Sequence, residues 1–263
     1  MEAPQPPPAE ALQIRLHGPA DLPTLIYLPG LHGDWTLASG LRHALADRVR
    51  FVEFTYPRTL TWSLADYAAA ISEMLLAHGI TRGWLLGESF GSQIVWPLLQ
   101  RGDFIADGVI LAGGFVKHPV PLGSRIVEIG LRRVPLRCVV FLFQAYGWSR
   151  LFRRHRPSEF SSSLNEFLAR RTELDRQAMV HRLRLITAND PREIARAARL
   201  AVYFLSGFFD PIVPWPFVRA WLRRHCPGFR ETRILGHADH TVLSTGARAS
   251  AEQIVVWLGA NRS

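Results

Sequence analysis

Three side chains in this sequence have the types that nucleophilic catalysis requires. Ser89 lies in "GESFG", Asp210 in "SGFFDPIVP" and His240 in "GHADHTVL", in the chain order serine, acid, histidine. A serine hydroxyl becomes a useful nucleophile when a histidine within hydrogen-bond reach takes its proton and an acid orients that histidine. The three residues therefore suggest acyl transfer, provided that the fold brings them together.

The spacing around Ser89 has a mechanical explanation. In "WLLGESFGSQ", residues 84–93, an apolar run meets a serine placed between two glycines as G-x-S-x-G. This spacing is typical of a sharp strand-to-helix turn that exposes the serine hydroxyl at its apex. Glycine fits the crowded backbone there because it has no Cβ. Three fixed positions among five also recur by chance, so the motif needs support from the rest of the chain.

The elements around these residues alternate between strand and helix. We expect strands at 12–17, 25–30, 49–57, 82–87, 107–115, 201–207 and 230–236, the first of them at an edge of the sheet. We expect helices at 37–47, 63–79, 90–100, 191–200, 216–226 and 247–259, with Ser63 and Asp66 forming a capping box. This alternation predicts an α/β fold with a mostly parallel, doubly wound sheet. The loops leaving the carboxyl ends of such strands converge at one edge, and these loops carry Ser89, Asp210 and His240.

Residues 116–189 interrupt this rhythm. They are basic, rich in aromatic residues and helix-like, with several prolines. We expect a helical cap or lid inserted between the two parts of the core, 12–115 and 190–263. Residues 1–11 are proline-rich and are expected to form a disordered tail.

At this point the chain resembles the α/β-hydrolase family, over residues 12 to 260. The resemblance rests on "LPGLHGDW", "GESFG", "SGFFDPIVP" and "GHADHTVL", which follow the family's order at successive strand ends. It implies that Ser89 is the nucleophile, that His240 is the general base and then the general acid, and that Asp210 orients the imidazole.

The resemblance also implies an oxyanion hole of two backbone N–H groups. One belongs to Phe90, the residue after the nucleophile, and the other to the loop that follows the strand "LIYLPG". The second donor depends on whether the family's His-Gly pattern is aligned with Pro29-Gly30, which makes Leu31 the donor, or with His32-Gly33, which makes Asp34 the donor. Leu31 is preferred because Gly30 is nearest the strand end, whereas Asp34 would bring a carboxylate beside an oxyanion. Pro29, where the family commonly has histidine, is a departure that affects this register.

Neighbours of the three residues compete with them for the same roles. His237 follows Gly236 closely and could replace His240 as the base, although His240 lies further along the loop and can swing over the serine. Asp239 is expected to be a loop residue, since neighbours in sequence rarely point at the same imidazole. Glu88 is expected to hydrogen-bond nearby backbone.

Large aromatic residues lie on or near the loops expected to line the site, which favours a bulky apolar acyl or aromatic substrate. The expected substrate-binding residues are His32, Trp35, Phe115, Trp148 and Trp215.

The basic charge of the chain is concentrated in one segment. The formal net charge is +9, and residues 115–189 contain 14 Lys and Arg against 5 Asp and Glu, while the remainder is balanced at 17 against 17. Residues 125–156 interleave arginine with large apolar groups. Two interpretations stay open: a cap with its arginines in water, or a surface for an anionic partner, either a phospholipid interface or an acidic carrier protein bearing an acyl thioester.

Several other classes are disfavoured. Leu235 stands where a binuclear zinc pattern around "HADH" needs histidine, so no metal is expected. No cofactor is expected, because no G-x-G-x-x-G follows the first strand and no G-K-[ST] loop occurs. No nucleic-acid partner is expected. No apolar run reaches 18 residues, no secretory signal is recognisable, and the two cysteines, Cys138 and Cys226, suggest the cytoplasm.

The function that the resemblance implies is hydrolysis of a small-molecule carboxylic ester, with thioesters close behind. Acyltransferases and carbon–carbon bond hydrolases use the same three residue types, so they remain alternatives. A ligand-binding receptor on the same fold is the non-enzymatic alternative, because fold alone does not decide function. The sequence indicates no oligomeric state.

Overall fold

The computed structural model describes residues 11–120, 128–130, 132–133, 138 and 172–260. Its centre is a seven-stranded sheet in the order β1-β3-β2-β4-β5-β6-β7, parallel throughout except for β1, which runs antiparallel to β3 at one edge. The strands are β1 (Gln13–His17), β2 (Thr24–Leu28), β3 (Arg50–Thr55), β4 (Arg82–Glu88), β5 (Ile105–Ala112), β6 (Ala201–Gly207) and β7 (Phe229–Leu235). The sequence prediction of a mostly parallel sheet with an edge strand at residues 12–17 is confirmed, and the antiparallel direction of that strand was not predicted.

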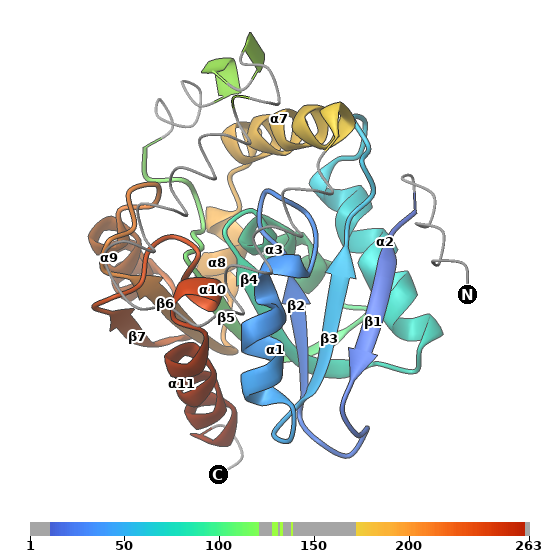
Figure 1. Ribbon diagram of the computed structural model, residues 1–263. Helices are drawn as coiled ribbons and strands as arrows, with labels where there is room; N and C mark the ends of the chain where they lie inside the picture. The colour runs from blue at the N-terminus through green and yellow to red at the C-terminus, as the bar shows by residue number, and fades with distance from the viewer. Residues whose placement is uncertain (1–10, 121–127, 131, 134–137, 139–171, 261–263) are drawn as a thin grey trace.

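Helices cover both faces of the sheet, as Figure 1 shows. One face packs against α2 and α3 and the other against α1 and α11, with a separate apolar core on each side. The helices are η1 (Thr36–Ala38, a 3₁₀ turn), α1 (Ser39–Leu45), α2 (Leu64–Ala77), α3 (Gly91–Arg101), α7 (Glu173–Ala188), α8 (Arg192–Ala197), α9 (Trp215–His225), α10 (Val242–Thr245) and α11 (Ala247–Ala260). The Ser63–Asp66 capping box is present at the start of α2.

Most element boundaries lie close to those expected from the sequence, and the differences have local causes. The strand expected at 25–30 ends at Leu28, immediately before Pro29, which has no N–H to donate to the sheet. The strand expected at 107–115 ends at Ala112, because Gly113 takes a positive φ of 53° and turns the chain. The four-residue helix α10 lies in a loop for which the sequence predicted no helix.

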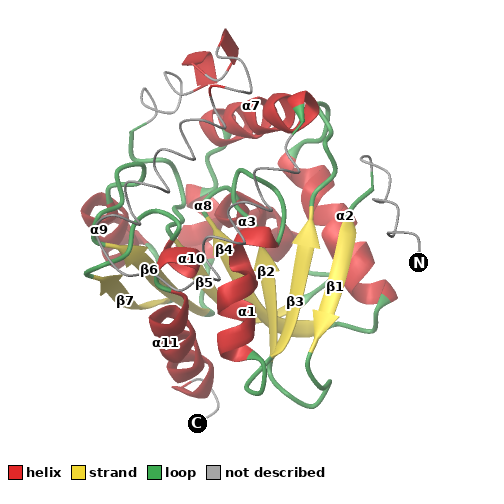
Figure 2. Ribbon diagram, in the orientation of Figure 1, coloured by secondary structure: helices red, strands yellow, loops and turns green. Residues whose placement is uncertain are grey.

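The described part of the expected insertion contains one long helix. This helix, α7, lies above the carboxyl ends of the parallel strands, where the loops coloured green in Figure 2 gather. Most of residues 121–171 and residues 1–10 fall outside the described ranges, so the cap at 116–189 and the tail at 1–11 stay predictions. Among the helices of the described ranges, none combines the length and the apolar character needed to span a bilayer.

Candidate active site

Ser89 occupies a strained turn between β4 and α3. Its φ of 47° is the only positive φ of a non-glycine residue in the described ranges. The turn is held by the Ser89 N–H, which donates to the carbonyl of Ala112 on β5 (3.0 Å). It also packs tightly on the end of β2: a Cβ on Gly91 would lie 2.0 Å from the Leu28 carbonyl oxygen. This turn needs a residue without Cβ at position 91, which explains the second glycine of the motif.

His240 bridges Ser89 and Asp210 through its two ring nitrogens. Nε2 lies 2.9 Å from Ser89 Oγ, and Nδ1 lies 2.8 Å from Asp210 Oδ2. The other carboxylate oxygen of Asp210 accepts the backbone N–H groups of Ile212 (2.9 Å) and Val213 (2.8 Å). The Asp210 side chain is fully buried, so these hydrogen bonds fix a carboxylate that water does not reach.

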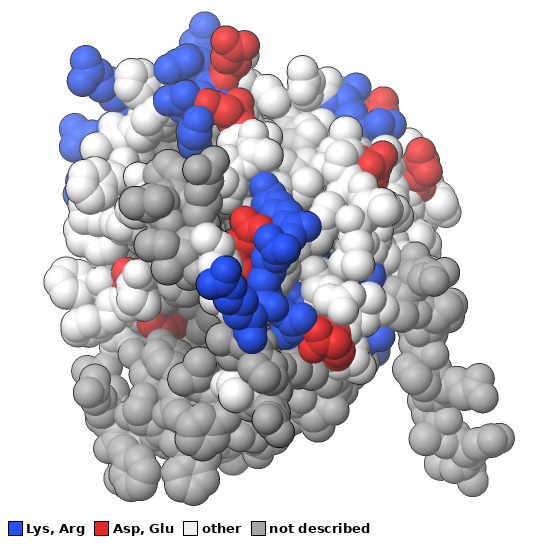
Figure 3. Space-filling view, turned by 90° about the horizontal axis from the view of Figure 1, so that it is seen from above, with Lys and Arg blue, Asp and Glu red and all other residues white. Residues whose placement is uncertain are grey.

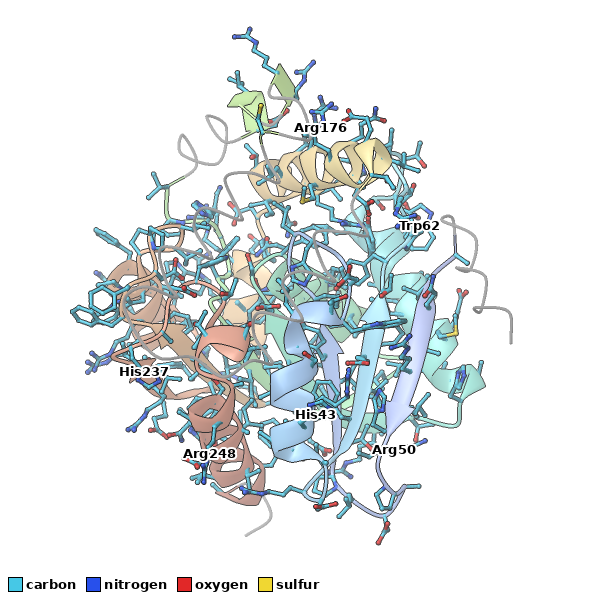
Figure 4. All side chains as sticks on the ribbon, in the orientation of Figure 1. His43, Arg50, Trp62, Arg176, His237 and Arg248 are labelled. Atoms are coloured by element: carbon cyan, nitrogen blue, oxygen red, sulfur yellow. The ribbon has the colours of Figure 1, made fainter. Side chains whose placement is uncertain are left out.

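The loop after β7 delivers His240 by a close backbone approach. Gly113 lies at the end of β5, where a Cβ would come within 2.7 Å of the His240 carbonyl oxygen. The Asp239 carboxylate turns away from the imidazole and accepts hydrogen bonds from the N–H and hydroxyl of Thr241 and from the hydroxyl of Thr245. His237, the competitor for the base, is exposed and lies at the periphery of the molecule in Figure 4.

The surroundings of His240 favour its protonated form. Burial on its own lowers the pKa of the imidazole, but the hydrogen bond and the negative charge of Asp210, with smaller effects of Glu88 and Asp239, raise it above 6.5 overall. The surroundings of the neighbouring His118 favour its neutral form instead, because burial lowers the pKa of that imidazole. An imidazole that is stabilised when charged suits a base that must carry a proton during a reaction.

The loop after β2 lies beside the serine. A Cβ on Gly30 would lie 3.5 Å from Ser89 Cβ and 3.3 Å from the ring of His32, so Gly30 lies against both residues. The Asp34 carboxylate accepts the N–H of Thr36 (2.9 Å), at the start of the turn that leads into α1. This arrangement agrees better with Leu31 than with Asp34 as the register for an oxyanion donor, a choice that remains a prediction together with the role of Phe90.

A buried polar network behind the serine was not expected from the sequence. Ser92 Oγ donates to the Ser89 carbonyl (2.6 Å) and accepts the N–H of Phe115 (3.1 Å). Gln93 Nε2 donates to the carbonyls of Phe115 (2.9 Å) and Val116 (3.1 Å). These contacts join the base of the turn to the chain leaving β5. Both side chains are fully buried, as polar groups with hydrogen-bond partners can be, but that burial follows from the fold and gave no signal in the sequence.

Glu88 differs from its expected environment. Its carboxylate, almost fully buried, accepts a hydrogen bond from the Tyr27 hydroxyl on β2 instead of from the backbone. Burial and the Glu88 charge raise the pKa of Tyr27 well above 10, so the phenol stays a donor. The pair fixes the end of β4 immediately before the serine.

The expected substrate-binding aromatics are placed differently from one another. The ring of Trp35 packs under the Arg15 guanidinium of edge strand β1 (3.9 Å), and Phe115 is buried with its ring edge-to-face with His118. Trp215 begins α9 near the exposed ring of Phe208 (6.2 Å between centroids). Trp148 lies outside the described residues. The binding role of all four stays a prediction.

Within the described ranges, no group of three or more His, Cys, Asp or Glu side chains is placed to hold a metal ion.

A scan with protein-family models finds no match, and no curated protein matches the sequence.

Solved structures, in contrast, match almost the whole chain. A hydrolase from Pseudomonas aeruginosa superimposes with a TM-score of 0.76 at 16% identity, covering 94% of each chain. An esterase from Exiguobacterium antarcticum gives 0.76 at 14% identity over 96% of each chain. The enol-lactonase from Burkholderia xenovorans LB400 gives 0.74 at 17% identity, over 94% of this chain and 96% of that one. At such identities the likeness is one of fold, and with the strand order above it leads to one conclusion: this chain has the α/β-hydrolase fold.

Proposed function

We propose that this protein is a serine hydrolase that cleaves carboxylic esters through an acyl-enzyme. The observation that carries the proposal is the continuous chain from Ser89 Oγ to His240 Nε2 (2.9 Å) and from His240 Nδ1 to Asp210 Oδ2 (2.8 Å). A nucleophile, a base and an orienting acid within hydrogen-bond reach are the geometric requirements for acyl transfer.

In the proposed reaction, Ser89 Oγ attacks the ester carbonyl carbon while its proton passes to His240 Nε2. The carbonyl oxygen becomes an oxyanion, and Asp210 stabilises the imidazolium that forms. The tetrahedral intermediate collapses, the C–O bond to the leaving alcohol breaks, and the alcohol takes the proton from His240. Water then repeats the sequence on the acyl-enzyme and releases the carboxylic acid and free Ser89.

The proposed oxyanion hole consists of the backbone N–H groups of Leu31 and Phe90. Phe90 directly follows the nucleophile, and Leu31 follows Gly30, which lies against Ser89. Donors held rigidly by the fold stabilise the oxyanion without reorganisation during the reaction, and a single such donor contributes roughly 10²–10³-fold in kcat.

Esters are the preferred substrate class, because several matching structures bear the name esterase, one of them from Rhodococcus. These names describe those proteins and support a small ester here only as a proposal. A bulky apolar acyl or aromatic group remains the expected substrate, with His32 on the loop after β2 and Trp215 at the start of α9 as the expected contacts.

The basic segment gives limited support for an anionic partner. In its described part, Lys117, Arg176 and Arg184 form ion pairs with Asp190, Glu173 and Glu128 respectively. Acidic side chains accordingly lie among the basic ones in the view from above (Figure 3). Paired charges of this kind fit a solvated outer face. The exposed Arg132 and Arg133 of the same segment remain a proposed contact for an anionic membrane or an acidic carrier protein. The cytoplasm remains the proposed location.

An acyl-enzyme mechanism predicts a burst of product. Mixing the protein with excess p-nitrophenyl acetate should release close to one equivalent of p-nitrophenol per chain before the steady state, provided that deacylation is slower than acylation. Acid quenching during the burst should trap an acetylated protein by mass spectrometry. A receptor without catalytic activity would release no p-nitrophenol above the buffer rate.

The raised pKa of His240 predicts the acid limb of the activity profile. Only the neutral imidazole can accept the serine proton, so kcat/KM should rise with pH through an apparent pKa above 6.5. Replacing Asp210 with asparagine removes the two largest raising effects, and the His240 pKa followed by NMR should then fall below its wild-type value. An unchanged His240 pKa in that variant would contradict the assignment of Asp210 as its partner.

A further inference from the structure

Arg182 is a charged residue on the buried face of α7. Only 2% of its surface is exposed, and the helix buries Ala178, Met179, Leu183 and Ile186 beside it. A buried guanidinium is costly unless its donors are satisfied. Its contacts therefore indicate what this side chain does.

The guanidinium reaches two loops at the carboxyl edge of the sheet. Nη1 donates to the Leu31 carbonyl (3.0 Å), and Nη2 donates to the Pro57 carbonyl (3.0 Å). Nε points at the Tyr67 hydroxyl at a longer distance of 3.4 Å, and the group lies 5.5 Å from the centre of the Tyr56 ring. A planar fork with several fixed donors can hold two carbonyls at once, which a lysine cannot reproduce.

The loop after β2 also folds around this guanidinium. Gly33 has a φ of 78°, and a Cβ there would lie 2.3 Å from Arg182 Nη1. The Gly33 N–H donates to the Gly30 carbonyl (3.0 Å), which belongs to the same peptide group as the Leu31 N–H. Because the C=O and N–H of a trans peptide point in opposite directions, holding the Gly30 carbonyl fixes the direction of the Leu31 N–H.

We infer that Arg182 is a positioning residue for the oxyanion hole: it fixes the Leu31 carbonyl and supports Gly33, and so aims the Leu31 N–H. The inference rests on the proposed function, which assigns that N–H to the oxyanion. The fixed positive charge of the guanidinium adds a favourable field for a nearby negative charge in a site of low dielectric constant. A helix from the 116–189 segment thereby takes part in shaping the catalytic loop.

The alternative role is a plain tether that holds α7 on the core. The chain offers a matched control for that role, because Arg58 forms an ion pair with Asp175 of α7 (2.7 Å). Arg58 lies next to Pro57 in sequence, and its side chain bonds Asp175 of α7 and not the loop at 30–34. Arg58→Met removes a tether of α7, whereas Arg182→Met removes a tether and the support of Leu31.

The test compares these variants on p-nitrophenyl acetate. Arg182→Met is expected to lower kcat by about 100-fold, as expected for a displaced oxyanion donor, with little change in KM. The affinity for a trifluoromethyl ketone, whose oxygen becomes an oxyanion when Ser89 adds to it, should fall by a similar factor. Arg182→Lys keeps the charge and the apolar stem and should recover part of the loss. Arg58→Met should keep kcat and the ketone affinity.

Hydrogen exchange gives a readout that does not need activity. The Gly33 amide should exchange faster in Arg182→Met than in the wild-type protein, and at the wild-type rate in Arg58→Met. If Arg182→Met does not fold, the milder Arg182→Lys should show the faster exchange. Equal losses in the Arg58 and Arg182 variants, or an Arg182 variant with unchanged kcat and Gly33 exchange, would overturn the inference. The proposed function fails separately if the wild-type protein neither turns over esters nor reacts with the ketone. In that case the exchange difference between the Arg182 and Arg58 variants could still be present.

Discussion

Replacing Ser89 with alanine is expected to lower kcat on p-nitrophenyl esters by about 10⁵–10⁶-fold. The reason is that His240 and Asp210 assist only through the serine hydroxyl, so removing it disables all three residues together. Binding and oxyanion donors leave a small residual rate above that of water. Initial rates at saturating ester, corrected for the buffer rate, measure the loss.

A control serine separates loss of chemistry from loss of folding. Ser63 is exposed and caps α2 with its hydroxyl, so Ser63→Ala should lose about 1 kcal/mol of stability in urea unfolding and keep kcat. Ser89→Ala should show the opposite, a cooperative unfolding transition without turnover. Turnover of Ser89→Ala within tenfold of wild type would exclude Ser89 as the nucleophile.

Replacing His240 with alanine is expected to be almost as severe as the loss of Ser89. Its Nε2 lies 2.9 Å from the serine oxygen and is the group placed to take the proton. Asp210→Asn should lower kcat by about 10⁴-fold, because the amide favours the wrong imidazole tautomer and no longer stabilises the imidazolium. His240→Ala removes both hydrogen bonds of the imidazole, whereas Asp210→Asn changes only the one at Nδ1.

The control for this prediction is His237→Ala. His237 is exposed at the periphery, and its replacement should leave kcat close to the wild-type value. The reverse ranking, with His237→Ala severe and His240→Ala mild, would move the base three residues towards the amino terminus and would contradict the geometry at Ser89.

The sheet and the placement of the three central residues could be predicted because local signals agree with the fold. Apolar runs ending at Gly87, Gly207 and Gly236 marked strand ends, and parallel strands bring such ends to one edge. The capping box at Ser63 and Asp66 marked the start of α2 independently of packing. Serine, acid and histidine loops could therefore be expected to meet before any coordinates were known.

Residues that act through tertiary contacts could not be predicted in the same way. The support of Leu31 by Arg182 joins positions 151 residues apart, and the network of Ser92 and Gln93 depends on where the chain runs after β5. One signal was present for Arg182: it lies on the same helical stripe as Ala178, Met179 and Ile186, where an arginine is unusual. The apolar stripe could identify Arg182 as unusual, but its hydrogen-bond partner, the Leu31 carbonyl, could be found only from the fold.

The most direct test of the proposed function is to locate a covalent adduct. The protein is treated with a fluorophosphonate until ester turnover stops, and then digested and mapped by tandem mass spectrometry. We expect one adduct per chain, on the peptide that contains Ser89. Its formation should match the loss of turnover, and it should be absent in His240→Ala. Full ester turnover without an adduct, or an inactivating adduct on a residue other than Ser89, would contradict the proposed function.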